Sequence, residues 1–440
     1  MNLVYLHSHD TGRYISPLGH AVATPALMSL AREGACFRNA HSAAPTCSPS
    51  RAALLTGLWA HSAGMLGLAH RGFALPDYRP HLASHLREHG YTTALSGIEH
   101  ESCRQHAMPA GLTYGLDLGR DSRSPHPAAV DFLRSVASVP PKARRPFFLS
   151  VGFFATHREA EGFALHDPAD DPAYVLVPPT LADTAANRLD VAGLHSSLRG
   201  LDAGIGEVLS ALRGLDLLNQ TLIVATTDHG LPFPDMKCRL TSHGTGVFLL
   251  LSGPGVPAGR VHDALVSQID LFPTLCSLLG VSAPAGLQGH SLVDLLGGRT
   301  DRVREELFAE VNYHAAYEPQ RAVRTLSHVY IRRYHSPRPP ILANCDDGPA
   351  KRERLDRTRW ASRPLATEQM HDLLLDPQEM HNLADGPDHR DTLNHLRGRL
   401  DAWMQATCDP LLQGDIPLPP GAVANLPTDA SPNLAPRLQG

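Results

Sequence analysis

The chain has 440 residues, of which 42% are hydrophobic, and a formal net charge of -5 at pH 7. This length predicts one large core with a smaller appended unit. The mildly negative charge gives neither a basic surface for nucleic acid nor a polybasic patch for a membrane, so we expect neither partner.

The seven cysteines are odd in number and show no C-x-x-C spacing. They therefore indicate neither a disulfide framework nor a structural zinc site, and they favour reduced thiols. The first ten residues contain no charged leader followed by a long apolar run, so we expect no signal peptide and a cytoplasmic protein.

Strand and helix patterns alternate along residues 1–300. Apolar or β-branched runs predict strands at 2–8, 91–96, 147–153, 221–227 and 247–251. Helical spacing and caps predict helices at 25–31, 80–90, 128–138, 191–215 and 269–279. This alternation predicts an α/β domain over residues 1–300, with a large mostly parallel sheet flanked by helices.

After Gly297-Gly298 the pattern changes to shorter strand-like runs. They lie at 307–311, 322–326, 329–333 and 371–375, with a charged and exposed excursion expected at 348–362 and a helix at 389–404. We expect a smaller C-terminal subdomain over 301–412, an antiparallel sheet with one covering helix. Residues 413–440 are rich in Pro, Asn and Gly and predict an extended or disordered tail.

Cys47 stands where an irregular segment gives way to the helix-forming run Ala52 to Leu55, which Gly57 can end. A helix N-terminus carries free N–H groups and favours an anion. With Arg51 one turn further on, this placement predicts a lowered thiol pKa. The alternative is a small buried side chain that happens to precede a helix.

Acidic and imidazole side chains follow two of the predicted strands. His9 and Asp10 come after the first strand, and Asp228 and His229 follow the strand at 221–227. Because α/β sheets bind ligands at the carboxyl ends of their strands, these residues predict a divalent metal site. For each alone, a turn or helix cap is the commoner role.

Three motifs carry a family resemblance. Cys47-Ser48-Pro49-Ser50-Arg51 resembles the signature of the sulfatases, and Thr227-Asp228-His229-Gly230 resembles the second metal motif of sulfatases and the wider alkaline phosphatase superfamily. Residues 373–384 resemble a segment of sulfatase C-terminal subdomains, and within the family the first two motifs look most like the sulfamidases.

The resemblance implies that Cys47 is oxidised to formylglycine by a formylglycine-generating enzyme. It also implies one divalent metal ion, most often calcium in the family, bound by Asp10, Asp228, His229 and the oxidised Cys47. By the same resemblance Arg51, His100, His157 and Lys237 are catalytic, with the cations neutralising a sulfate and a histidine protonating the leaving group. Arg158, Glu159 and His243 are further pocket candidates without a clear counterpart.

Two positions depart from the family pattern. His9 stands where sulfatases usually have the first of two aspartates, so it is either a metal ligand that favours manganese or zinc or a donor behind the ligands. Ile98 stands where the family has a lysine, in Gly97-Ile98-Glu99-His100, so a cation at the sulfate must come from elsewhere.

The resulting expectation is metal-dependent hydrolysis of a sulfate ester or sulfamate, from a small, anionic, sulfated or N-sulfated sugar. A phosphonate monoester or phosphodiester hydrolase on the same site is the alternative, since less positive charge suits a less charged diester. A non-catalytic binding protein is the third hypothesis. The oligomeric state stays open.

Overall fold

The computed structural model describes residues 1–102, 113–159, 162–163, 170–336 and 338–440. Its larger sheet has eight strands in the order β11-β2-β10-β9-β1-β6-β4-β5. They are β1 (Asn2–Ser8), β2 (Gly34–Phe37), β4 (Thr92–Gly97), β5 (Leu116–Arg120), β6 (Phe147–Gly152), β9 (Thr221–Thr227), β10 (Leu249–Ser252) and β11 (Arg260–His262). Only β10 runs antiparallel to its neighbours, which confirms the predicted mostly parallel sheet.

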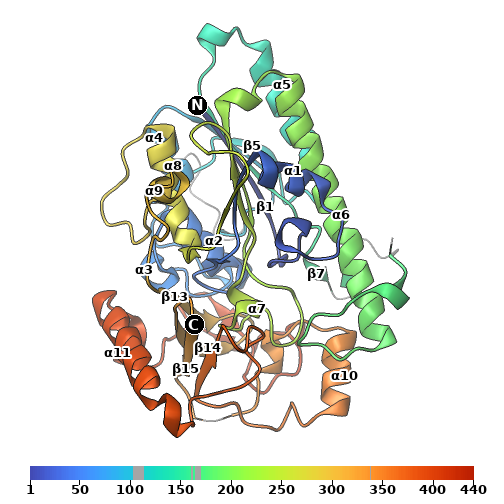
Figure 1. The fold of residues 1–440 in the computed structure, drawn as a ribbon, viewed down its shortest axis with the longest axis vertical. Helices are drawn as coiled ribbons and strands as arrows, with labels where there is room; N and C mark the ends of the chain where they lie inside the picture. Colours follow the sequence, from blue (N-terminus) through green and yellow to red (C-terminus); the bar gives the residue numbers. More distant parts are fainter. Residues whose placement is uncertain (103–112, 160–161, 164–169, 337) are drawn as a thin grey trace.

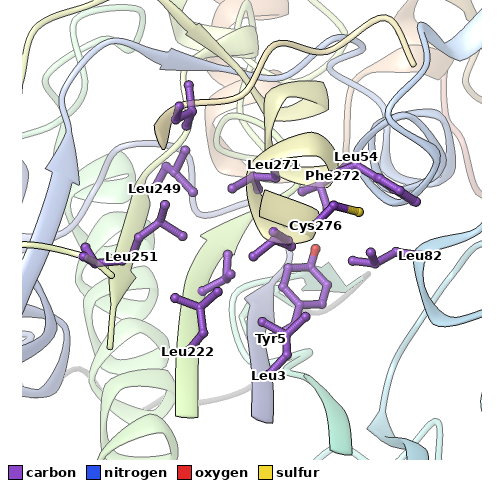
Figure 2. Close-up of a cluster of buried hydrophobic side chains, with 14 of the residues drawn as sticks. Leu3, Tyr5, Leu54, Leu82, Leu222, Leu249, Leu251, Leu271, Phe272 and Cys276 are labelled. Carbon is purple, nitrogen blue, oxygen red and sulfur yellow. The ribbon is translucent and has the colours of Figure 1, made fainter. Parts of the chain in front are cut away.

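Helices cover both faces of this sheet, as Figure 1 shows. One face carries α1 (Pro25–Glu33), α5 (His126–Ser138) and α6 (Ala185–Gly214); the other carries α2 (Cys47–Thr56), α4 (Leu82–Glu88), α8 (Leu271–Leu279) and α9 (Val293–Leu296). Successive strand residues point to opposite faces, so Leu3 and Tyr5 of β1 enter one core and Val4 and Leu6 the other. Figure 2 shows the first of these cores, where Leu3 and Tyr5 lie with Leu222, Leu271 and Phe272.

The long helix α6 begins earlier than the predicted residue 191. Thr184 caps it by accepting a hydrogen bond from the Asn187 N–H at 3.3 Å. In the first turns Ala185, Ala186 and Leu189 are exposed and the polar Asn187 is buried, so the apolar periodicity starts only after the helix has begun.

The smaller sheet is antiparallel, in the order β13-β14-β15-β16. Its strands are β13 (Leu307–Tyr313), β14 (Tyr317–Arg324), β15 (His328–Arg333) and β16 (Glu368–Asp372). The helix α11 (Arg390–Ala406) packs Leu396, Leu400 and Trp403 against one face of this sheet. The opposite face of the sheet contacts Leu240 of the large unit. The expected arrangement of one sheet with one covering helix is therefore observed (Figure 1).

The remaining elements are short. They are the helices α3 (Ala60–Ala63), α7 (Ser242–Thr245) and α10 (Pro349–Arg357), and the strand pairs β3 (Ala40–His41) with β12 (Val266–Ser267), β7 (Arg158–Glu159) with β8 (Gly162–Phe163), and β17 (Val423–Ala424) with β18 (Leu438–Gln439).

The segment expected as an exposed excursion at 348–362 is partly buried. It forms α10, and the buried Lys351 donates to the carbonyl oxygens of Leu342 and Cys345, each at 2.8 Å, and to Asp347 at 2.7 Å. The charged side chain thus fixes the loop before the helix, which the charge pattern did not reveal.

Residues after 413 run back along the molecule as an extended arm. Asn425 is fully buried: its N–H donates to the Ala315 carbonyl at 2.8 Å, and its Oδ1 accepts from Arg71 at 2.8 Å. Arg71 also donates to the Pro432 carbonyl at 3.0 Å. These contacts bring the arm to the carboxyl edge of the large sheet.

Within the described residues, none of the helices is long and apolar enough to cross a membrane.

Candidate active site

The two strand ends predicted to hold a metal lie side by side. β1 and β9 are adjacent and parallel, with Ser8 paired to Thr227. His9, Asp10, Asp228 and His229 therefore emerge together, each at most 3% exposed. The Asp10 N–H donates to Asp228 Oδ1 at 2.9 Å, which fixes the two turns to each other.

Cys47 enters this group from the first residue of α2. Its Sγ lies 3.3 Å from His229 Nε2. Ser50, one turn further on, donates to the Asp228 carbonyl at 2.6 Å and so ties the helix to the strand end. The predicted convergence of Cys47 with the two strand ends is observed.

The thiol environment differs from the prediction. Burial, with a further contribution from Asp228 and Asp10, raises the pKa of Cys47 well above its ordinary value despite Lys237 and Arg51. The expected lowering of the pKa is wrong, because a helix terminus and one arginine do not offset complete burial beside two carboxylates.

Arg51 lies behind the site rather than in its cavity. Its Nη2 donates to Asp228 Oδ2 at 2.9 Å and to the Ser8 carbonyl at 2.8 Å, and its Nη1 lies 2.6 Å from His7 Nδ1. Burial opposes ionisation of Asp228, but His229, Arg51 and His9 hold the pKa of this carboxyl well below its usual range. Arg51 therefore keeps a metal-site carboxylate charged, and its position does not support the expected direct contact with a sulfate.

The residues present fit a divalent cation. Ligand atoms of His9, Asp10, Cys47 and Asp228 all lie within 4.8 Å of one another. Asp10 Oδ1 and His9 Nε2 are buried without a hydrogen-bond partner among the described residues. His229 Nε2 lies 3.4 Å from Asp10 Oδ1, so it faces the same point. Buried polar atoms without partners are costly, and a cation would satisfy them.

A cavity of about 300 Å³ opens onto Cys47. Of the predicted catalytic residues, His100, His157 and Lys237 line it. Arg158 and Glu159 also line it, whereas His243 lies outside, with its Nε2 3.0 Å from the Gln378 carbonyl.

Lys237 is a buried cation of the cavity wall. Its Nζ lies 3.2 Å from Asp10 Oδ2 and 3.2 Å from Asp346 Oδ2. Burial alone would lower its pKa, but Asp10 and Asp346 raise it well above the ordinary value. Lys237 therefore stays charged and links the metal site to the substrate cavity.

The histidines of the cavity are neutral near pH 7. Burial, reinforced by Lys237, lowers the pKa of His157 to about 4, and burial lowers that of His100 well below its ordinary value. A bound anion would raise both pKa values, so the expected proton donor would be charged only with substrate in place.

Sequence reasoning missed several lining residues: His70, Arg71, His314, Asp346, Asp347, Pro432 and Asn433. They come from loops, the β13–β14 turn, the α10 loop and the C-terminal arm. Ile98 is not among the lining residues. Arg71 and the predicted pocket candidate Arg158 add cations to the wall, and no motif indicated Arg71.

Residues that fit a divalent cation lie at the carboxyl end of a mostly parallel sheet, beside a cysteine at a helix start, as the resemblance to the sulfatases implies. The family model described as Sulfatase matches residues 1–281, and the one described as N-sulphoglucosamine sulphohydrolase, C-terminal, matches residues 242–351. The chain belongs to the sulfatase family.

The relatives agree with this assignment. The human N-sulphoglucosamine sulphohydrolase is 31% identical over 89% of this chain and 87% of its own length. An ulvan-active sulfatase of Formosa agariphila is 26% identical over 93% of this chain and 75% of its own length.

Solved structures share the fold. A 2-O GAG sulfatase superposes with a TM-score of 0.69 at 20% identity, covering 97% of each chain. A phosphonate monoester hydrolase from Silicibacter pomeroyi gives a TM-score of 0.70 at 18% identity, covering 92% of this chain and 95% of its own.

Proposed function

We propose that the protein hydrolyses a sulfate ester or a sulfamate on a small sulfated or N-sulfated sugar, through a formylglycine made from Cys47. The placement of Cys47 carries this proposal, because its Sγ lies 3.3 Å from His229 at the meeting point of the two strand ends. The similarity to the human N-sulphoglucosamine sulphohydrolase supports the sulfamate in particular.

Formylglycine is an aldehyde whose hydrate carries two hydroxyl groups. One hydroxyl oxygen attacks sulfur as the S–O or S–N bond to the sugar breaks, and the leaving oxygen or nitrogen takes a proton. The second hydroxyl then loses its proton, the aldehyde re-forms, and sulfate leaves. A formylglycine-generating enzyme is therefore a required partner for maturation.

Asp10, Asp228, His229 and the oxidised Cys47 would hold a divalent cation. When bound, the cation supplies the positive charge that acidifies the hydrate and offsets the charge of the sulfate. Calcium is the ion that the family implies, whereas the imidazoles of His229 and His9 favour manganese or zinc.

The chain's own cations act on the sulfate from the cavity. Lys237 remains charged beside Asp10 and is placed to neutralise a sulfate oxygen. His157 and His100 line the same cavity and would gain a proton when the anion binds, which places either to protonate the leaving group. A cavity of about 300 Å³ is at the small end of ligand pockets and suits one sugar unit.

The test uses protein co-expressed with a formylglycine-generating enzyme. Intact mass of the Cys47 peptide should show the aldehyde in place of the thiol, and turnover should appear on an aryl sulfate and an N-sulfated glucosamine. Cys47→Ala should abolish turnover while the protein remains folded. A matured protein without turnover on any sulfur ester would overturn the proposal.

A phosphonate monoester or phosphodiester hydrolase is the second candidate. The Asp228-His229 pair and Ile98 favour it, since a site without the family's lysine suits a less charged substrate. Rates on an aryl phosphonate monoester, measured beside the two sulfur substrates, separate the candidates. Fast phosphonate cleavage with negligible sulfur-ester cleavage would select the second.

A further inference from the structure

Two imidazoles face each other beside Cys47 on the cavity side of the strand ends. The ring centroids of His9 and His100 lie 5.5 Å apart. Ligand atoms of His9, His100 and Cys47 all lie within 4.8 Å of one another. This group shares His9 and Cys47 with the group of Asp10 and Asp228 but adds His100 from the loop after β4.

Each imidazole is oriented by a partner on its other nitrogen. Asp228 Oδ2 lies 3.2 Å from His9 Nδ1, and His70 Nδ1 lies 3.0 Å from His100 Nε2. The nitrogens left over are His9 Nε2 and His100 Nδ1, and both are buried without a hydrogen-bond partner among the described residues. A histidine fixed by a second group on its other nitrogen is the usual arrangement of a metal ligand.

The backbone at His100 is held in an uncommon conformation. Its φ is +67°, in the left-handed region that non-glycine residues seldom adopt. Such strain persists where the surroundings fix it, often at ligand sites. The His100 ring lines the cavity, with Nε2 toward His70 and Nδ1 without a partner in the described part of the chain.

The donors of this group are two imidazole nitrogens and the atom at Cys47. Nitrogen and sulfur donors suit zinc and similar transition ions rather than calcium.

We propose that His9, His100 and the atom at Cys47 form a second metal site, for a transition ion such as Zn²⁺, beside the ion of the family site. The third ligand is the thiolate before maturation and an oxygen of the hydrated aldehyde afterwards. The proposal takes from the proposed function only that the family site holds an ion. A zinc ion has ligands at about 2.0–2.3 Å, so small movements would bring the three side chains to binding distance and leave a fourth position for a substrate oxygen.

The second ion would add a positive charge beside Cys47. Together with the ion at Asp10 and Asp228 it would form a pair that shares the Cys47 atom, an arrangement that suits two oxygens of one anion. His9 is then a ligand of the second ion, with Asp228 orienting it, rather than a ligand of the first. His100 binds the same ion, so His157 is the histidine left to protonate the leaving group.

The test counts metal ions on the matured full chain. Protein stripped with a chelator is loaded with Zn²⁺, dialysed and analysed by elemental mass spectrometry, with Ca²⁺ loading in parallel. We expect two Zn²⁺ per chain in the wild type and one in His100→Ala. His314→Ala, which alters a different wall of the cavity, should keep two.

His70 orients His100 in this proposal, and a separate measurement of zinc affinity tests that role. His70→Ala should weaken the second Zn²⁺ by about 10- to 100-fold in competition with a chromogenic chelator, with the first unchanged. On unmatured protein loaded with Co²⁺, a thiolate-to-metal absorption band should report the Cys47 ligand and weaken in His100→Ala.

One Zn²⁺ per chain in the wild type, or two retained in His100→Ala with an unchanged affinity, would overturn the second site. Turnover of sulfur substrates is measured on the same samples. Two ions without turnover would leave this inference standing and reject the proposed function. Turnover with one ion would reject this inference and leave the proposed function standing.

Discussion

Arg51 Nη2 donates to Asp228 Oδ2 at 2.9 Å, and both side chains are almost completely buried. The same guanidinium donates to the Ser8 carbonyl at 2.8 Å, so it joins the first residue after β9 to the last residue of β1. Arg51 thus helps to hold the residues of the metal site in place.

Arg51→Ala should therefore act first on stability. Removing one partner of a buried ion pair leaves the other charge uncompensated, and we expect a loss of about 3–5 kcal/mol in the free energy of unfolding of chelator-treated protein. Urea unfolding measures it. Arg51→Lys keeps the charge but not the two-pronged contact, so an intermediate loss is expected. Equal stability of the wild type and Arg51→Ala would contradict this role.

Lys237 should act on turnover rather than on folding alone. It is the buried cation between Asp10 and Asp346, and Lys237→Met should lower kcat/KM on a sulfur substrate by about 10²–10³-fold. Steady-state rates at fixed metal loading measure this. Lys237→Arg, which keeps the charge, should recover part of the loss.

A matched variant removes the second partner of the same lysine. Asp346→Asn should leave Lys237 charged beside Asp10 and make the cavity less negative, so sulfate should inhibit at lower concentration than in the wild type. Inhibition by sulfate is the measurement. Weaker inhibition would show that Asp346 positions Lys237 rather than opposes the anion.

The sequence predicted those parts of the site that adjoin regular elements. His9, Asp10, Asp228 and His229 follow buried strands, and Cys47 starts a helix, so periodicity and capping located all five. It did not predict Asp346 or Asn433, because no local pattern indicates that a loop before α10 and a C-terminal arm return to the sheet edge.

The direction of the Cys47 pKa was wrong for a related reason. The helix terminus and Arg51 are visible in the sequence, whereas complete burial beside Asp10 and Asp228 is a property of the folded chain. Long-range contacts of this kind decide the electrostatics of a site, and one sequence without tertiary information does not contain them in readable form.

A buried pair away from the active site predicts a pH dependence of stability. His61 Nδ1 lies 2.8 Å from Glu310 Oε1. Burial opposes both charges, but Glu310 raises the pKa of His61, and His61 with Arg321 lowers that of Glu310 to about 2. The His61 contribution is present below its unfolded pKa, about 6.5, and is lost as pH rises through the higher folded value. The Glu310 contribution is present above about 4.5 and is lost as pH falls through about 2.

The pair should therefore stabilise the fold most between about pH 4.5 and 6.5. Urea unfolding of the wild type and His61→Asn across pH 4–9 tests this. The difference in unfolding free energy should be largest in that window and should shrink toward pH 9. A difference that does not change with pH would show that His61 acts through packing and neutral hydrogen bonds.

The C-terminal arm should determine how well substrate binds. Asn425 accepts from Arg71 at 2.8 Å and donates to the Leu434 carbonyl at 3.1 Å, which holds Pro432 and Asn433 against the cavity. Asn425→Ala removes both contacts and should loosen the arm. We expect a KM raised several-fold with a smaller change in kcat, and faster cleavage after residue 425 in limited proteolysis.

Asn433→Ala is the control variant. It removes the side chain that lines the cavity but keeps the contacts of Asn425, so it should raise KM while the proteolysis rate stays that of the wild type. If Asn425→Ala speeds proteolysis but leaves KM unchanged, the arm stabilises the fold and takes no part in binding substrate.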